Sequence, residues 1–267
     1  MTVPVALSVA GSDPSGGAGI QADLATFAAF GVRGATVVTA LTAQNTAGVR
    51  GIAAVAPEFV VQQLDAVLDD LDVRAAKTGM LHRAAIVEAL ADRLRTRTVP
   101  HLVVDPVMVA TSGDVLLEPA AVALVRDRLV PLATLVTPNL REAEALTGQP
   151  VSDLAGMRAA ARALVALGAR AALITGGHLS TDPVDVLYDG RTFRELAAPR
   201  VPVPRTHGTG CALSAAVTAG LALGQPLDEA VTAAKRWITR ALATAPALGR
   251  GGRPPDHLAR PVPKARP

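Results

Sequence analysis

One short stretch of this 267-residue chain combines a glycine turn, a threonine and the only cysteine. Gly208-Thr209-Gly210 leads into Cys211 and an apolar run with helical character that extends to Leu223. The first turn of a helix has unpartnered N–H groups and the positive end of the helix dipole, so it can bind an anion. The same dipole predicts a lowered pKa for the Cys211 thiol. An oxyanion cradle beside a proton acceptor suits phosphoryl transfer, although a structural glycine turn with a small buried cysteine fits this segment equally well.

Apolar runs typical of buried strands alternate with helical patterns along the chain. We expect strands at 5–10, 35–42, 51–56, 74–77, 101–104, 134–136, 171–174, 184–188 and 192–196, with a polar loop at 43–50. We expect helices at 18–30, 57–71, 84–96, 118–129, 140–146, 153–167, 211–223 and 227–245. This order predicts an α/β fold with a mostly parallel central sheet and helices on both faces. Such sheets bind ligands at the carboxyl ends of their strands.

The composition indicates one domain, residues 1–249, followed by a flexible Pro/Arg-rich tail, residues 250–267. The tail carries five basic residues and one acid, so the rest of this chain of net charge +3 has a net charge of −1. That distribution, with only 2% aromatic residues, argues against a nucleic-acid partner. We expect no membrane span, because no apolar run reaches about 18 residues. The single cysteine excludes an intrachain disulfide and favours a cytoplasmic location.

The common nucleotide-binding motifs are poorly matched or absent. Gly17-Ala18-Gly19 opens a predicted helix after a strand, but a dinucleotide site also needs an acid at the end of the next strand. That strand ends in Leu41-Thr42 and is followed by Gln44. No Gly-Lys-Ser/Thr stretch follows a glycine loop, so a Walker A motif is absent and the 208–211 turn is the leading phosphate cradle. The histidines lack the spacing of metal ligands, and we expect His207 to shape the turn rather than to act as a base.

Several further polar residues could bind a ligand, and each also fits a structural role. Asp23, beside an apolar helix face, could hold a ligand donor or lie on the solvated flank of its helix. The Gln44 carboxamide could pair with the edge of a heterocycle or cap a turn. Asp105, which precedes a proline, suits a Mg²⁺–water contact or a turn. Asn139 and Glu142 have the spacing of a helix capping box, the interpretation that these residues alone favour.

Eight motifs occur in the order found in one known family. They are Ala10–Asp23, Thr39–Thr46, Lys77–Leu81, Asp105–Val109, Ser112-Gly113, Thr137–Glu142, Gly176–His178 and Thr206–Cys211. Through them the chain strongly resembles the hydroxymethylpyrimidine/phosphomethylpyrimidine kinases of thiamine biosynthesis, from residue 5 to about residue 245. Each motif alone is weak, whereas the ordered set is specific.

The resemblance implies a fold and an activity. The family belongs to the ribokinase-like superfamily, which implies a three-layer α/β/α sandwich. It implies an ATP- and Mg²⁺-dependent kinase, usually a homodimer. The substrates would be 4-amino-5-hydroxymethyl-2-methylpyrimidine and then its monophosphate, which is converted to the diphosphate.

The resemblance also implies roles for individual residues in binding the pyrimidine. The substrate-binding positions would be Gly11, Asp23, Gln44, Met80 and Val107. Gln44 would hydrogen-bond the aminopyrimidine, and Asp23 would face the hydroxymethyl end. Met80 and Val107 would line the pocket.

A second group of positions would serve the phosphates. Asp105, Asn139 and Glu142 would organise Mg²⁺, water and the nucleotide, with Asp105 and Glu142 as metal ligands, directly or through water. The turn 208–210 would form the anion hole. Cys211 would stand where the sugar kinases of the superfamily usually have an aspartate base.

The chain departs from the family pattern at Thr175. Many members have a lysine before the Gly-Gly-His motif, and that lysine is thought to meet the ATP phosphates. Thr175 occupies this nucleotide-binding position without a charge, so the cation is missing or comes from elsewhere.

Two other interpretations stay open. A pyridoxal/pyridoxine kinase of the same superfamily would also act on a small, flat heterocycle bearing a hydroxymethyl group, although Gln44-Asn45 and Met80 favour the pyrimidine. A non-catalytic pyrimidine-binding sensor would explain Thr175 as decayed catalysis. The presence of Cys211, Asp105 and the glycine turn argues against the sensor.

Overall fold

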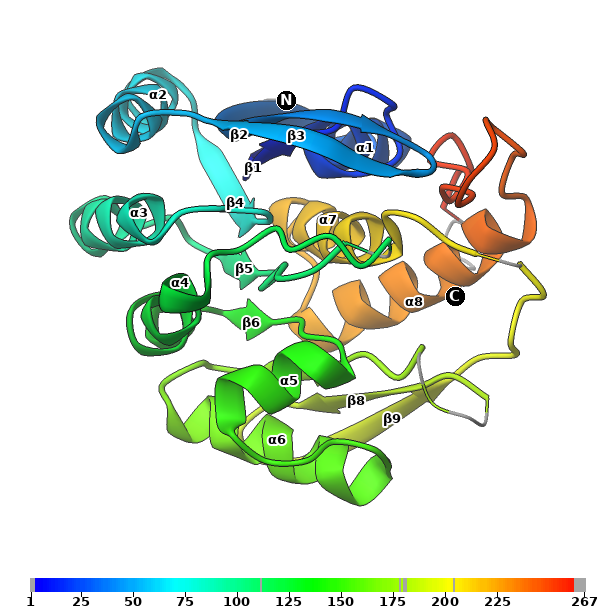
Figure 1. Cartoon of the computed structure of the whole chain (residues 1–267). Coiled ribbons are helices and arrows are strands. Elements are labelled where there is room, and N and C mark those ends of the chain that lie inside the picture. Colours follow the sequence, from blue (N-terminus) through cyan, green and yellow to red (C-terminus); the bar gives the residue numbers. More distant parts are fainter. Residues whose placement is uncertain (1–2, 111, 178, 180–181, 204, 262–267) are drawn as a thin grey trace.

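A nine-stranded sheet forms the centre of the computed structural model, which describes residues 3–110, 112–177, 179, 182–203 and 205–261 (Figure 1). The strands are β1 Val5–Ser12, β2 Arg33–Asn45, β3 Gly48–Ala54, β4 Val73–Thr78, β5 Leu102–Val104, β6 Leu135–Val136, β7 Ala172–Ile174, β8 Val184–Tyr188 and β9 Phe193–Ala197. Their order is β3-β2-β1-β4-β5-β6-β7-β8-β9. Six adjacent strands, β2, β1, β4, β5, β6 and β7, pair in parallel, and antiparallel strands form both edges.

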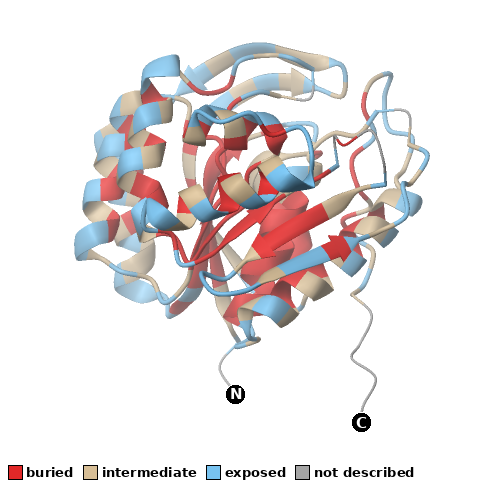
Figure 2. Cartoon of the chain, turned by 90° about the horizontal axis from the view of Figure 1, so that it is seen from below, coloured by how far each residue is buried: buried red, intermediate tan, exposed pale blue. Residues whose placement is uncertain are grey.

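Helices cover both faces of the sheet, which confirms the predicted α/β sandwich. The helices are α1 Gly19–Ala29, α2 Pro57–Asp70, α3 Ala84–Thr96, α4 Pro119–Leu124, α5 Leu140–Thr147, α6 Leu154–Ala166, α7 Thr209–Ala222 and α8 Leu227–Ala243. Side chains of α2 to α6 pack in one core, and those of α1, α7 and α8 pack in the other. In β1, Ala6 faces the second core while Leu7 faces the first, as the alternation of a strand requires. Buried residues gather in the sheet and on the inner sides of the helices (Figure 2).

Helix α7 is the most deeply buried of these helices. Every residue from Ala212 to Ala222 is buried, which explains why its sequence is apolar all round rather than amphipathic. Gly220 lets it approach α8 closely, since a Cβ there would lie 2.8 Å from the Cβ of Ala230. The helix that carries Cys211 is therefore held rigidly by its neighbours. None of the helices in the described part of the chain is long and apolar enough to cross a membrane.

Two segments differ from the sequence expectation. Residues 43–50, expected as a loop, belong to the hairpin of β2 and β3, in which Gln44 pairs with Val49 and Asn45 with Gly48. This part of the hairpin lies at the sheet edge, and β3 has no buried residue, so residues 43–50 lack the apolar run that marks a core strand. The helix expected at 118–129 ends as α-helix at Leu124 and continues as a wider π turn, Val125–Leu129.

The predicted flexible tail is wrong for the described residues 250–261. The Gly252 N–H donates to the Thr46 carbonyl oxygen at 2.8 Å, and the Arg253 N–H donates to that of Arg205 at 2.8 Å. The Trp237 indole N–H donates to the Ala259 carbonyl oxygen at 2.6 Å. Backbone hydrogen bonds, which composition does not reveal, hold this segment onto the domain. Residues 262–267 of the tail, and His178 of the Gly176–His178 motif, lie outside the described residues.

Candidate active site

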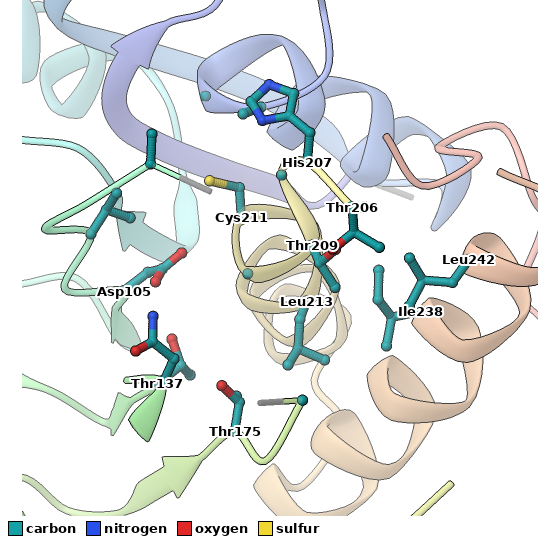
Figure 3. A pocket seen from close by; sticks show the side chains of 18 of the residues that line it. Asp105, Thr137, Thr175, Thr206, His207, Thr209, Cys211, Leu213, Ile238 and Leu242 are labelled. Carbon is teal, nitrogen blue, oxygen red and sulfur yellow. The ribbon is translucent and has the colours of Figure 1, made fainter. Parts of the chain in front are cut away.

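A cavity of about 430 Å³ opens at the carboxyl ends of the parallel strands. Each of five strands contributes a lining residue just after or at its end: Asp13 after β1, Met80 after β4, Asp105 after β5, Thr137 after β6 and Thr175 after β7. The first turn of α7 and one side of α8 complete the wall. In Figure 3, Cys211 and His207 lie on one side of this turn, and Ile238 and Leu242 of α8 lie on the other. The volume is in the range of small-molecule sites.

The N-terminus of α7 presents an uncapped glycine turn to this cavity. Gly208 is the N-cap residue with a φ of 75°, and no side chain caps the helix. A Cβ at Gly208 would overlap the carbonyl oxygen of Gly17, so two glycine segments meet here in close backbone contact. Gly210, in contrast, has open space where a Cβ would lie. The first turn of α7 thus has the geometry in which backbone N–H groups can face an anion, and it stays a candidate anion cradle.

The Cys211 thiol lies on the third residue of α7 and contributes to the cavity wall. Burial raises the pKa of Cys211 to about 12, and the positive charge of Lys77 opposes that rise only in part. The predicted lowering of this pKa is therefore wrong. The helix dipole at Cys211 is outweighed by burial and by the negative charges of Asp105 and Asp23. At neutral pH Cys211 is a thiol.

Asp23 is placed differently from the sequence expectation. It does not line the cavity, and its side chain is fully buried. One carboxylate oxygen lies 2.8 Å from the Lys77 ammonium, and the other accepts a hydrogen bond from the Ser8 hydroxyl at 2.5 Å. The Lys77 side chain is also fully buried, so it needs a carboxylate partner. Asp23 supplies that charge beneath the site rather than facing the substrate.

Lys77 connects this buried pair to Cys211 and Asp105, two residues of the cavity wall. Its ammonium donates to the Cys211 carbonyl oxygen at 3.5 Å and lies 3.9 Å from Asp105 Oδ2. Burial by itself would lower the pKa of Lys77, but the charge of Asp23 raises it overall. Asp105 also accepts a hydrogen bond from the Ser214 hydroxyl at 2.8 Å. The sequence analysis gave no specific role to Lys77, although a lysine next to the buried alanines of strand β4 indicates a buried charge.

Asn139 and Glu142 form the expected capping box and also line the cavity. The Glu142 N–H donates to Asn139 Oδ1 at 3.1 Å, and the Asn139 N–H donates to Glu142 Oε2 at 2.9 Å. The structural and the ligand-binding interpretations are therefore compatible. Burial raises the pKa of Glu142 to about 8, and the nearby negative charge of Asp105 adds to this rise.

The polar groups around Asp105 and Glu142 fit a Mg²⁺ ion. Two carboxylates whose charges oppose each other line one cavity, and a cation between them or bound through water would relieve that opposition. The Thr137 hydroxyl lies beside them in the wall, buried and without a hydrogen-bond partner. Oxygen donors of this kind suit a hard divalent cation. Among the described residues, no group of three or more acidic, histidine or cysteine side chains is placed to hold a metal ion, so Mg²⁺ here would need most of its ligands from water and phosphate oxygens.

The expected pyrimidine-binding residues, except Asp23, line the same cavity. Gly11, Gln44, Met80 and Val107 all contribute to its wall. The Met80 sulfur lies 3.0 Å from the place of a Cβ at Gly11, so a side chain at position 11 would crowd the pocket.

A pair missed by the sequence analysis lies beside Gln44. His207 Nε2 lies 2.8 Å from Asp13 Oδ2 and 3.2 Å from Gln44 Nε2. Burial acts to raise the pKa of Asp13, but hydrogen bonds from His207 and Ser15 lower it overall. Asp13 also accepts from the Ala18 N–H at 2.9 Å, which ties the first glycine loop to His207. His207 thus shapes the turn, as expected, through a partner that no spacing in the sequence indicates.

Thr175 lines the cavity, and a cationic side chain from another element lies close to the loop that carries Thr175. The Lys235 ammonium of α8, which also lines the cavity, lies 2.7 Å from Asp185 Oδ2. The other oxygen of Asp185 accepts from the Gly176 N–H at 2.9 Å. A lysine that is ion-paired with Asp185 therefore lies near the Thr175 loop, and it comes from another element.

Comparison with known proteins agrees with this geometry. A sequence model of the family described as phosphomethylpyrimidine kinase matches residues 13–256. The chain belongs to this family. A hydroxymethylpyrimidine/phosphomethylpyrimidine kinase of Rhizobium meliloti is 52% identical over 256 residues, which cover 95% of this chain and 96% of that protein. The motif-based expectation of a kinase of thiamine biosynthesis is confirmed.

One further relative is similar in sequence, and one solved structure is similar in fold. The thiamine biosynthesis bifunctional protein of Geobacter sulfurreducens is 52% identical over 253 residues, and the chain spans 52% of that longer protein. The crystal structure of a pyridoxal kinase of Bacillus subtilis in an ADP complex superposes with a TM-score of 0.89 at 40% identity, covering 97% of this chain and 98% of that one. The ribokinase-like fold is thus shared with kinases of two vitamin substrates.

Proposed function

We propose that the protein transfers phosphate from ATP to 4-amino-5-hydroxymethyl-2-methylpyrimidine and then to its monophosphate, which gives the diphosphate. The observation that carries this proposal is the cavity of about 430 Å³ at the carboxyl ends of the strands. It joins the Gln44 side of the wall to the uncapped turn of α7, and all the expected site residues except Asp23 line it. The family membership supports the same reaction.

The phosphates of ATP bind at the first turn of α7. Its N–H groups and the positive end of the helix dipole stabilise the negative charge of the phosphoryl group during transfer. Mg²⁺, held by Asp105 and Glu142 directly or through water, would neutralise further charge on the phosphate oxygens. Asn139 keeps Glu142 in place through the capping box. Lys235 supplies positive charge near the Thr175 loop.

The pyrimidine lies against Gly11, Met80 and Val107, with the Gln44 carboxamide at its amino-substituted edge. A carboxamide offers a donor and an acceptor together, which matches the paired groups of an aminopyrimidine. The hydroxymethyl group then points to Cys211 and the turn. Positioning the two reactants in this way supplies much of the rate acceleration of phosphoryl transfer.

Cys211 accepts the hydroxymethyl proton in the first step. Because its pKa is raised to about 12, only a small thiolate fraction exists at neutral pH, and the first step should accelerate as the pH rises. In the second step the nucleophile is a phosphate oxygen that is already anionic, so no base is needed. The two steps therefore depend differently on the same cysteine.

Phosphorylation of pyridoxal is the second candidate activity. The similarity to the pyridoxal kinase of Bacillus subtilis over nearly the whole chain favours it, and pyridoxal also bears a hydroxymethyl group on a flat ring. Both substrates would use the same anion turn. They differ in the ring edge that meets Gln44.

The test is ADP release by the purified protein with Mg-ATP and one of three substrates: the hydroxymethylpyrimidine, its monophosphate, or pyridoxal. We expect a higher kcat/KM for both pyrimidines than for pyridoxal. Turnover of pyridoxal alone would assign the protein to the vitamin B6 kinases. Saturable pyrimidine binding without any turnover would instead support the sensor interpretation.

We also propose that the enzyme is a cytoplasmic homodimer. The single cysteine suits a reducing compartment. Light scattering of the purified protein should give twice the 27.2 kDa mass of the chain. A mass of one chain at micromolar concentration would contradict the dimer.

A further inference from the structure

The chain beyond α8 turns back and contacts the tip of the β2–β3 hairpin. We call residues 249–260 the C-terminal strap. The Gly251 N–H donates to Thr46 Oγ1 at 3.1 Å, and the Gly252 N–H donates to the Thr46 carbonyl oxygen at 2.8 Å. Figure 1 shows this orange and red end of the chain beside the tip of the hairpin. Since β3 has no buried residue, the sheet core gives this tip little support of its own.

The same strap pairs with the segment that leads into the anion turn. The Arg253 N–H donates to the Arg205 carbonyl oxygen at 2.8 Å, and the His207 N–H donates to the Arg253 carbonyl oxygen at 3.0 Å. Together these bonds form a parallel bridge between Thr206 and Arg253. The bridge ends one residue before Gly208. Adjacent strap residues therefore hold both the hairpin tip and the entrance of α7.

The strap is itself anchored to α8. The Asp256 N–H donates to the Ala241 carbonyl oxygen at 2.8 Å, and the Thr244 hydroxyl donates to Asp256 at 3.1 Å. The indole N–H of Trp237, whose ring packs edge-on against Phe30, donates to the Ala259 carbonyl oxygen at 2.6 Å. Because α8 packs along α7 in one hydrophobic core, these contacts attach the strap to that core.

The strap holds two segments whose residues Gln44 and His207 line the part of the cavity in which the pyrimidine is proposed to bind. Thr46 lies two residues after Gln44, and the bridged His207 has its Nε2 3.2 Å from Gln44 Nε2 and 2.8 Å from Asp13 Oδ2. A shift of the strap would move Gln44 relative to His207 and to the adjoining turn. It would leave Thr175, Lys235 and Asp185 in place, since these residues are held by other contacts.

We propose that the C-terminal strap is a positioning element for substrate recognition, which sets the distance between the Gln44 carboxamide and the anion turn. This role rests on the proposed function, because it presumes that the pyrimidine binds against Gln44. Gly251 is the position on which the strap depends most. A Cβ there would overlap the carbonyl oxygen of Thr46, so only glycine permits this approach of the two backbones.

The test compares Gly251→Ala, Thr46→Val and Thr46→Ser in the full-length protein, with KM measured separately for the hydroxymethylpyrimidine and for ATP. Thr46→Val removes the hydroxyl acceptor and should raise the pyrimidine KM about two- to tenfold, the range expected for one hydrogen bond. Thr46→Ser keeps the hydroxyl and should restore the wild-type KM. Gly251→Ala forces the strap away and should raise the pyrimidine KM more than about tenfold. The ATP KM should stay within about twofold in Thr46→Val and Thr46→Ser, which leave the Arg253 bonds to the segment before the turn in place, and should rise less than the pyrimidine KM in Gly251→Ala.

Two controls accompany these variants. Thr232→Val removes a comparable hydroxyl bond, to the Asp228 carbonyl oxygen on α8, and should change neither KM. Fluorescence of Trp237, the only tryptophan, reports whether the strap stays anchored to α8 in each variant.

The outcomes distinguish a failure of the strap proposal from a failure of the proposed function. A wild-type protein that does not phosphorylate the pyrimidine would overturn the proposed function. Wild-type turnover with an unchanged pyrimidine KM in Gly251→Ala and Thr46→Val would overturn the strap alone. Equal rises of both KM values, or a failure of Thr46→Ser to restore the pyrimidine KM, would also contradict positioning and indicate a general loss of structure.

Discussion

At the scale of single residues, Cys211 combines a helix N-terminus with a thiol whose pKa is raised. Helix position alone suggested a thiolate, whereas burial and two buried carboxylates raise the pKa of this thiol to about 12. Sequence shows that Cys211 begins a helix, but it does not show which charges the fold places around it. The same limit explains Asp23, whose partner Lys77 lies 54 residues away in the chain.

The raised pKa predicts a slow reaction of Cys211 with iodoacetamide. At pH 7.5 the thiolate fraction should be about 10³-fold smaller than that of a free cysteine, because the pKa of the Cys211 thiol is raised to about 12. The alkylation rate, followed by mass spectrometry on this single-cysteine chain, should still rise about tenfold per pH unit between pH 9 and pH 11. A rate that reaches a plateau near pH 9 would contradict the raised pKa.

Substitution of Cys211 should separate the two phosphorylation steps. Cys211→Ala should lower kcat of the first step by about 10²–10⁴-fold, the usual contribution of a general base, and leave the second within about threefold. It should also abolish the rise of the first step with pH. Rates are measured separately with the hydroxymethylpyrimidine and with its monophosphate.

Cys211→Ser is the matched control for that experiment. A hydroxyl preserves the packing but is a much weaker acid than a thiol, so this variant should stay impaired in the first step. Equal losses in both steps, or recovery of the first step in Cys211→Ser, would assign Cys211 a packing role instead.

At the scale of secondary-structure elements, the glycine turn before α7 depends on two different glycines. Gly208 has a positive φ of 75°, and a Cβ there would meet the Gly17 carbonyl group. Gly208→Ala should therefore reduce the free energy of unfolding by at least about 1–3 kcal/mol, the usual cost of a strained backbone residue. Gly210→Ala, with open space around its Cβ, should be neutral or should stabilise by up to about 1 kcal/mol.

Urea unfolding of the two alanine variants measures this difference. Similar stabilities for Gly208→Ala and Gly210→Ala would show that the contact with Gly17 does not constrain the turn. The chain offers this comparison because both glycines lie in the same motif and differ in backbone conformation.

The tip of the β2–β3 hairpin and the docked strap are two elements that the sequence patterns did not predict. Strands β2 and β3 include residues 43–45 and 48–50, which are mostly polar and lack the apolar run that marks a strand in sequence. The strap is held mainly by main-chain hydrogen bonds, to which any residue type contributes. Both features arise from pairing between distant segments, and local composition carries no information on such pairing.

At the scale of the whole molecule, the predicted order of strands and helices matches the structure, because each apolar run must be buried on at least one face of the sheet. β5, with the sequence Leu-Val-Val, is fully buried, and α3 has the predicted bounds Ala84–Thr96. Parallel strands with connecting helices bring their carboxyl ends together, so the motif residues after β1, β4, β5, β6 and β7 had to meet in one region. Their detailed partners, such as His207 for Asp13, follow only from the folded chain.

The most direct test of the two-step kinase is the stoichiometry of the complete reaction. The purified protein is incubated with excess Mg-ATP and a limiting amount of the hydroxymethylpyrimidine, and the ADP formed is compared with the pyrimidine consumed. We predict that the ratio reaches two and that the pyrimidine diphosphate is the final product. A ratio that stops at one, with the monophosphate as the end product, would contradict the second activity of this site.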